Sequence, residues 1–160
     1  MSRRPIAVIA LMVLAGSCLV WSTARCAGAQ PRTEPEPGSG KGSSLFERLG
    51  GTNGVTSLVD DLVKRVSDDS RINAFFARTD AAALKEQLTD QICALSGGPC
   101  TYGGRDMRAA HKGMGIRNAD FTAFMEGFIA ALHAAHVSPA DEGTLVGKML
   151  SMKADIVEVP

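Results

Sequence analysis

One histidine of this chain stands in a setting that suits a metal ligand. His111 ends a short amphipathic segment that begins near Arg105, and Gly113 and Gly115 follow it at alternate positions. Glycine lets the backbone turn away sharply, so that an imidazole ring can face a flat ligand beside it. Imidazole is a natural axial ligand of haem iron, and this chemistry makes His111 the candidate ligand. A histidine that simply closes a helix is the alternative interpretation.

The other two histidines are weaker metal candidates. His133 and His136 lie three residues apart near the end of a predicted helix, where an imidazolium interacts well with the carbonyl end of the helix dipole. Two such side chains alone do not make a metal site. The chain also has no Cys-x-x-Cys-His motif, so we expect any haem to be held by packing and one iron bond, without covalent attachment.

The motifs around His111 follow one another in the order of a known family. They are Ser44 to Gly51, Phe75-Phe76, Gly97-Gly98-Pro99 and Tyr102-Gly103-Gly104. With His111, they resemble a group I truncated haemoglobin over roughly residues 44 to 158. The resemblance implies an all-α fold, the truncated globin, in which four principal helices form a two-on-two sandwich. It also implies haem b as a noncovalent cofactor and His111 as the proximal ligand.

The same resemblance suggests which residues surround the haem. Phe76 matches a phenylalanine that stacks near the haem in the family, and Ile116 and Phe121 follow the ligand at the family spacing. The candidates for packing are Phe76, Leu84, Leu88, Met107, Ile116 and Phe121. The candidates for contact with the haem propionates are the cations Lys85, Arg105 and Arg108, together with Tyr102.

The chain departs from the family pattern on the distal side. Leu62-Val63 replaces the usual Phe-Tyr pair, and Leu88 stands where many members carry a glutamine that hydrogen-bonds oxygen. We therefore predict an apolar distal pocket formed by Val63, Leu84 and Leu88. Gln87 occupies the position of a histidine that binds the iron in some members. Two interpretations of Gln87 stay open, a hydrogen-bond donor in the pocket and a residue that faces solvent.

These residues predict a globin that reversibly binds oxygen, carbon monoxide or nitric oxide. Oxygen transport, electron transfer through a redox partner and sensing are the physiological roles that stay open. A haem enzyme, either a nitric oxide dioxygenase or a peroxidase, is the main alternative. Such chemistry needs a titratable distal group, which the three apolar residues do not supply, so we expect a binding protein rather than an enzyme. A helical adaptor without haem is the third hypothesis. It would bind a partner through Met149 and Met152, or zinc through Cys93, Cys100 and His111.

The first 29 residues predict export. Arg3-Arg4 precede an apolar run that ends at Trp21, and Ala27-Gly28-Ala29 resembles a cleavage site, so residues 1–29 are interpreted as a signal peptide. An uncleaved anchor and a lipoprotein modified at Cys18 are the alternatives, and only these would bring the protein to a membrane. Residues 30–43 are rich in proline and glycine and predict a flexible linker before the globin domain, residues 44–158. We expect a periplasmic location.

Two cysteines follow the predicted signal. Cys93 and Cys100 flank a chain-reversing segment, and an oxidising compartment would favour a disulfide between them, although two unlinked thiols are the alternative. The 17 acidic residues balance the 17 basic ones, which argues against a nucleic-acid partner.

Hydrophobic periodicity predicts the helices that position these residues. They cover Val55 to Val66, a segment that starts at Asp80, a long helix capped by Asn118, and a last helix after Ser138-Pro139 that continues to Ile156. Between the second and third, the glycine-rich region from Gly97 to Gly115 leaves little room for regular helix.

Overall fold

The computed structural model describes residues 42–159. The predicted signal, residues 1–29, and most of the predicted linker, residues 30–43, lie outside this range. The described residues form helices and no named strand. The elements are α1 (Leu45–Arg48), α2 (Gly51–Asp68), a 3₁₀ turn (Asn73–Phe75), α3 (Ala81–Leu95), α4 (Met107–His111), α5 (Asn118–Ala134), α6 (Pro139–Ser151) and α7 (Lys153–Ile156).

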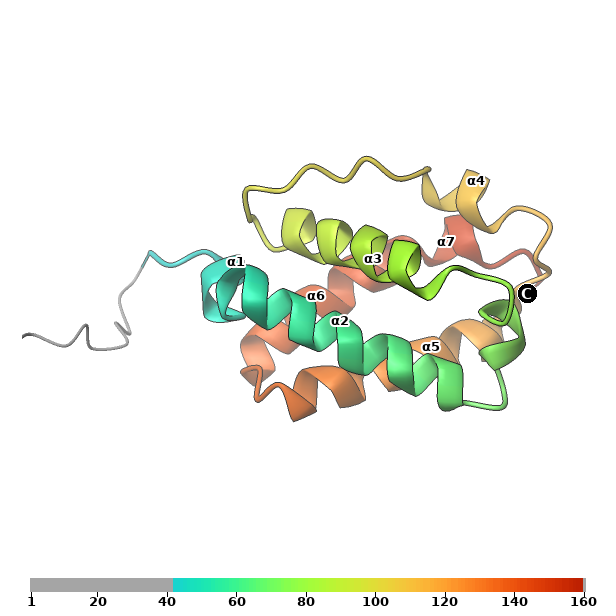
Figure 1. Ribbon diagram of the computed structural model, residues 1–160, viewed down its shortest axis with the longest axis horizontal. Coiled ribbons are helices and arrows are strands. Elements are labelled where there is room, and N and C mark those ends of the chain that lie inside the picture. The colour runs from blue at the N-terminus through green and yellow to red at the C-terminus, as the bar shows by residue number, and fades with distance from the viewer. Residues whose placement is uncertain (1–41, 160) are drawn as a thin grey trace, which may run out of the picture. The chain divides into compact units, whose positions relative to one another are not determined.

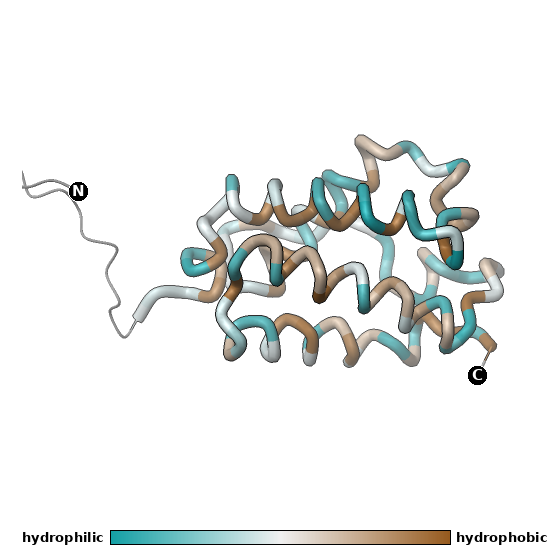
Figure 2. The backbone as a smooth tube through the Cα atoms, turned by 90° about the horizontal axis from the view of Figure 1, so that it is seen from below, coloured by the Kyte–Doolittle hydropathy of each residue, from teal (hydrophilic) through white to brown (hydrophobic). Residues whose placement is uncertain are grey.

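The four long helices pack as two pairs. Helix α2 contacts both α3 and α5, and α5 contacts α6 (Figure 1). The short helices α4 and α7 lie side by side at one end. Hydrophobic and hydrophilic stretches alternate along the helices in the front of the view (Figure 2). The predicted all-α, two-on-two arrangement is therefore confirmed.

The core lies on the buried face of α2, which faces both neighbouring helices. Leu58, Leu62 and Val66 are fully or almost fully buried there, as the helical periodicity predicts. Phe128 and Leu132 of α5 are completely buried in the same cluster. The predicted apolar faces of these two helices therefore meet in one core.

Side-chain caps fix where most helices begin. The Asp80 carboxylate accepts the backbone N–H groups of Ala82 and Ala83, and Ser138 caps α6, as predicted. Asn118 was predicted to cap α5, but it is the first helical residue, and Arg117 is the cap. The reason is Asp120, whose carboxylate accepts the Arg117 N–H and pairs with its guanidinium.

The last predicted helix is interrupted. Instead of one continuous helix to Ile156, α6 ends at Ser151 and α7 begins at Lys153, with Met152 capping the first and starting the second. The interruption lets α7 pack against α4, the helix that carries His111. The break therefore builds one side of the site.

Helix α1 joins the two pairs although it has only one turn. Its Phe46 N–H donates to the carbonyl oxygen of Ser96 at the end of α3, at 2.9 Å. Its Arg48 guanidinium binds Asp141 in the first turn of α6 with a shortest N···O distance of 2.6 Å. A side chain at Gly98 would collide with the Phe46 ring and with the Cys93 sulfur, both 2.6 Å from its position.

The segment from Ser96 to Asp106 runs back along α3 to reach α4 (Figure 1). The sulfur atoms of Cys93 and Cys100 are bonded in the structure, with their Cα atoms 5.8 Å apart. This link ties the end of α3 to the start of the segment. Among residues 42–159, no helix has both the length and the apolar character that a bilayer span needs.

Candidate functional site

A cavity of about 640 Å³ opens between α3, α4, α5 and the C-terminal helices. This volume lies in the range of roughly 300–1,000 Å³ that is usual for ligand and cofactor pockets. Most lining side chains are apolar. The lining residues are Ile72, Phe75, Phe76, Thr79, Ala83, Leu84, Gln87, Leu88, Gln91, Tyr102, Gly103, Gly104, Arg105, Met107, Ala110, His111, Met114, Ile116, Asp120, Phe121, Phe124, Met149, Met152 and Ile156.

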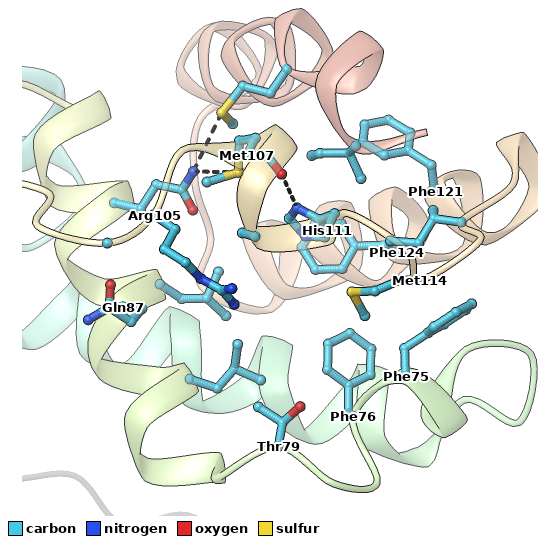
Figure 3. Close-up of a pocket in the computed structure, with 18 of the residues that line it drawn as sticks. Phe75, Phe76, Thr79, Gln87, Arg105, Met107, His111, Met114, Phe121 and Phe124 are labelled. Carbon is cyan, nitrogen blue, oxygen red and sulfur yellow. Dashed lines mark hydrogen bonds between the residues drawn. The ribbon is translucent and has the colours of Figure 1, made fainter. Parts of the chain in front are cut away.

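His111 stands at the C-terminal end of α4 and lines this cavity (Figure 3). Its Nδ1 atom lies 2.8 Å from the carbonyl oxygen of Met107, one turn earlier. Because that oxygen can only accept a hydrogen bond, Nδ1 carries a proton, and in the neutral ring Nε2 then keeps its lone pair. The arrangement fits an imidazole that ligates iron through Nε2, since metal-binding histidines commonly donate their other N–H to a carbonyl.

The backbone turns sharply after His111, as the two glycines predict. Gly113 has φ +81° and Gly115 has φ +65°, a left-handed conformation that glycine adopts without strain. Both N–H groups donate to the carboxylate of Glu158, each at 2.6 Å. These bonds lower the pKa of Glu158, and the nearby His111 acts in the same direction more weakly.

The wall across from His111 comes from α3 and the segment before it (Figure 3). Phe76, Leu84 and Leu88, which the family resemblance suggests as haem contacts, line this wall. Val63 was expected beside them, but it is buried in the core, 4% exposed, and does not line the cavity. The reason is its place on α2, the helix that packs between α3 and α5.

The polar residues that were predicted to contact the haem propionates divide into two groups. Tyr102 and Arg105 line the cavity, and the Arg105 guanidinium points into it (Figure 3). The Tyr102 hydroxyl donates to the Arg105 carbonyl oxygen at 2.9 Å, and burial raises its pKa. Lys85 and Arg108 do not line the cavity, because Lys85 pairs with Asp60 on α2 and Arg108 pairs with Asp155 on α7.

Gln87 lines the cavity from its edge. The residue is exposed, and its amide is directed away from His111 in the close-up view (Figure 3). A side chain at Gly104 would lie 2.3 Å from the Gln87 amide oxygen, so the amide rests against this loop. The geometry thus favours the second of the two interpretations, a residue at the solvent edge.

Several lining residues had no clear sequence signal. The buried amide of Gln91 donates weakly to the sulfur atoms of Met107 and Met152, at 3.6 and 3.4 Å. Asp120 reaches the cavity wall while it remains paired with Arg117. Phe124 of α5 also lines the cavity. Only the tertiary arrangement reveals these three positions.

A helical sandwich that encloses an apolar cavity with one oriented histidine is the architecture of a globin. The sequence model of the bacterial-like globins matches residues 44–158, and the chain belongs to this family. Among its relatives, a group 1 truncated haemoglobin of Tetrahymena pyriformis is 38% identical over 62% of this chain and 83% of the relative. One of Nostoc is 30% identical over 72% of this chain and 98% of the relative.

Solved structures agree with this assignment. The truncated haemoglobin of Tetrahymena pyriformis in its Fe(III) form superposes with a TM-score of 0.66 at 34% identity, covering 72% of this chain and 98% of that one. The 2/2 haemoglobin of a Synechococcus species, solved in the cyanomet state with covalently attached haem, gives 0.68 at 30% identity over the same shares. The chain is accordingly a haem-binding truncated globin, and gas binding is the general function of its family.

Proposed function

We propose that this protein holds haem b noncovalently through His111 Nε2 and binds small diatomic gases such as oxygen, carbon monoxide or nitric oxide at the opposite face. The single observation that carries this proposal is the orientation of His111. Its ring lines an apolar cavity of about 640 Å³ while Nδ1 is occupied by the Met107 carbonyl. The iron of the haem supplies the coordination position at which a gas binds.

Apolar side chains from both walls would hold the porphyrin. Phe76, Leu84 and Leu88 lie on the α3 side, while Met107, Ile116 and Phe121 lie on the side of His111. Phe121 is 5% and Ile116 is 7% exposed to solvent, so water has little access to this part of the cavity wall. Their packing would exclude water from the cofactor and would hold it without a link of the c type, for which the sequence carries no Cys-x-x-Cys-His motif.

Arg105 is the best placed partner for a haem propionate. It reaches into the cavity, and no ion pair of its guanidinium is found within residues 42–159. An arginine can bind a carboxylate through two parallel hydrogen bonds. We assign a smaller role to Tyr102, which shapes the loop by its bond to the Arg105 carbonyl, and no direct role to Lys85 and Arg108, which are paired elsewhere.

The distal wall favours gas binding over catalysis. The lining residues that α3 contributes are Ala83, Leu84, Gln87, Leu88 and Gln91. Gln87 is directed outward, and the Gln91 amide is bonded to the sulfur atoms of Met107 and Met152. Asp120 is the only carboxylate among all the lining residues, and Arg117 holds it in the charged form by lowering its pKa. A peroxidase or a dioxygenase requires a group that exchanges a proton beside the gas, and this wall provides none.

The test is a visible absorption spectrum of the full chain loaded with haem, in ferric and ferrous forms and with carbon monoxide. A strong Soret band is expected, and it should be lost or shifted in the His111→Ala variant. His133→Ala is the matched control, because His133 pairs with Glu142 away from the cavity. A protein that stays colourless with haem supplied would overturn the proposal and would redirect the search to zinc.

We further propose that residues 1–29 direct export, that residues 30–43 link this signal to the globin domain, and that the protein works in the periplasm with Cys93 and Cys100 joined. The bonded sulfur atoms support this location, since such bonds persist in oxidising compartments. Fractionation of expressing cells, with the mass of the mature protein before and after reduction and alkylation, tests the cleavage site, the lipid alternative at Cys18 and the disulfide together.

A further inference from the structure

The turn that follows the haem ligand is closed by a residue from the far end of the described chain. Glu158 accepts the N–H groups of Gly113 and Gly115 with its two carboxylate oxygens, one each, at 2.6 Å. The N–H of Met114, between the two glycines, donates instead to the His111 carbonyl oxygen at 3.1 Å. Two backbone N–H groups of one turn thus bind the two oxygens of one carboxylate.

The main chain brings Glu158 to this place. The backbone N–H groups of Glu158 and Val159 both donate to the Ile116 carbonyl oxygen, at 2.9 and 3.1 Å. Arg117 and Val159 also form an isolated parallel bridge. The carboxylate is therefore aimed at the turn by an independent set of hydrogen bonds, and its position does not depend on a flexible side chain alone.

The turn needs such a support because it has few other restraints. Residues 112 to 115 are exposed, and two of the four are glycines in the left-handed region. The one other backbone bond of the turn runs from Met114 N–H to the His111 carbonyl oxygen, at 3.1 Å. Without the carboxylate, the two glycine N–H groups would have no partner in the described chain, and the chain after His111 would have a wide choice of conformations.

His111 is thus held from two directions. On its N-terminal side, the Met107 carbonyl fixes the ring through Nδ1, and on its C-terminal side, Glu158 fixes the backbone two and four residues later. We infer that Glu158 is a positioning residue of the haem site, which sets the direction in which His111 presents Nε2 to the iron. This inference rests on the proposed function of His111 as the iron ligand.

Glu158→Gln tests the inference in the haem-loaded full chain. Glutamine has the same shape, but its amide nitrogen would face one of the glycine N–H groups, so one hydrogen bond and the charge are lost. We expect a shift of the iron–histidine stretching band in the resonance Raman spectrum of the ferrous protein. We also expect haem transfer to an apomyoglobin acceptor to become faster by about tenfold, as the loss of a charge-assisted hydrogen bond implies.

Asp155→Asn is the matched control. Asp155 lies in the same C-terminal segment and pairs with Arg108 of α4, but it does not touch the turn. This variant should reduce thermal stability slightly and should leave the iron–histidine band where it is in the unaltered protein. Equal effects of the two substitutions, or an unchanged band in Glu158→Gln, would overturn the inference, because general docking of the segment would then explain the contacts.

Two further measurements keep the outcomes distinct. If the unaltered protein shows no Soret band, the proposed function itself fails, whereas a normal spectrum with an unshifted band in Glu158→Gln rejects the positioning role alone. Should Glu158→Gln fail to fold, amide hydrogen exchange in the unaltered holoprotein decides the matter. Gly113 and Gly115 are expected to be protected although they are exposed, and fast exchange at both would contradict the inference.

Discussion

The Nδ1 atom of His111 lies 2.8 Å from the carbonyl oxygen of Met107, while the Met107 side chain forms part of the cavity wall. One residue therefore orients the ligand through its backbone and packs against the cofactor site through its side chain. The acceptor is a backbone oxygen, so no substitution of the Met107 side chain removes it directly. Substitutions at Met107 are expected to change the packing of haem more than the tautomer of His111.

Oxygen should leave this globin quickly. Leu84 and Leu88 line the distal wall, and neither can donate a hydrogen bond to oxygen. Leu88→Gln introduces a donor and should slow oxygen dissociation by about tenfold, because a single hydrogen bond contributes roughly 1–1.5 kcal/mol. Stopped-flow measurement of the dissociation rate checks this, with Leu88→Met as the apolar control. A rate in the unaltered protein as slow as in tyrosine-bearing relatives would refute it.

Gln87 is expected to have no part in oxygen binding. Its amide lies against Gly104 and is directed away from His111. The Gln87→Leu variant should therefore keep the oxygen association and dissociation rates of the unaltered protein within about twofold, a difference of less than roughly 0.5 kcal/mol. Flash photolysis and stopped-flow kinetics measure both rates. A clear rise in the dissociation rate would instead assign a donor role to Gln87.

Removal of the Cys93–Cys100 bond should destabilise the fold. In the chain-entropy model, closing so short a loop contributes about 2–3 kcal/mol, and the bond joins α3 to the segment that leads to His111. The double variant Cys93→Ser/Cys100→Ser should lower the free energy of unfolding in urea by about this amount. Reduction of the unaltered protein should reproduce the loss. If reduction changes neither the mass after alkylation nor the stability, the two cysteines are not linked in solution.

Asp141 should contribute modestly to stability. Its carboxylate is 12% exposed and binds both Arg48 and the Ser138 hydroxyl, so that α1 is attached to α6. The Arg48 side chain is 45% exposed, and screening by water limits the value of the pair. Asp141→Asn is therefore expected to lower the free energy of unfolding by about 1 kcal/mol. Asp68→Asn, which alters an exposed pair within α2, should have almost no effect.

The same pair predicts a dependence on pH. The hydrogen bonds from Arg48, and to a lesser degree from Ser138, hold the pKa of Asp141 below its ordinary value of 3.8. The folded state therefore binds this proton less readily than the unfolded state, and the contribution is complete above pH 4–5 and declines as the pH falls through the lowered pKa. Urea titrations at several pH values should show the difference between the unaltered protein and Asp141→Asn narrowing in acid. A constant difference down to pH 3 would contradict the assignment.

The sequence predicts well whatever depends on neighbours along the chain. Asp80 and Ser138 are caps with their partners two or three residues away, and the apolar stripe of α2 has a helical period. His111 became the candidate ligand because Gly113 and Gly115 follow it closely and because the surrounding motifs resemble those of the family. The long-range family pattern then supplied Phe76 and Leu88, which do line the cavity.

Positions that depend on distant segments were predicted less well. Val63 belongs to the right helix but lies in the core, since the contacts of α2 with both α3 and α5 decide which of its residues reach the cavity. Lys85 of α3 pairs with Asp60 of α2. The charge of Lys85 alone does not indicate which acidic residue it pairs with. Glu158 is 43 residues from Gly115, and only the bend at Met152 brings them together.

The single turn of α1 has a consequence for how fragments of this protein should be made. Its Phe46 backbone holds the end of α3, and its Arg48 holds the start of α6, so one short element joins the two helix pairs. Truncation before Ser44 removes none of these bonds, whereas a cut after Leu49 removes both. Limited proteolysis should therefore trim the chain down to the capping Ser44 and stop there, leaving a minimal unit that still refolds.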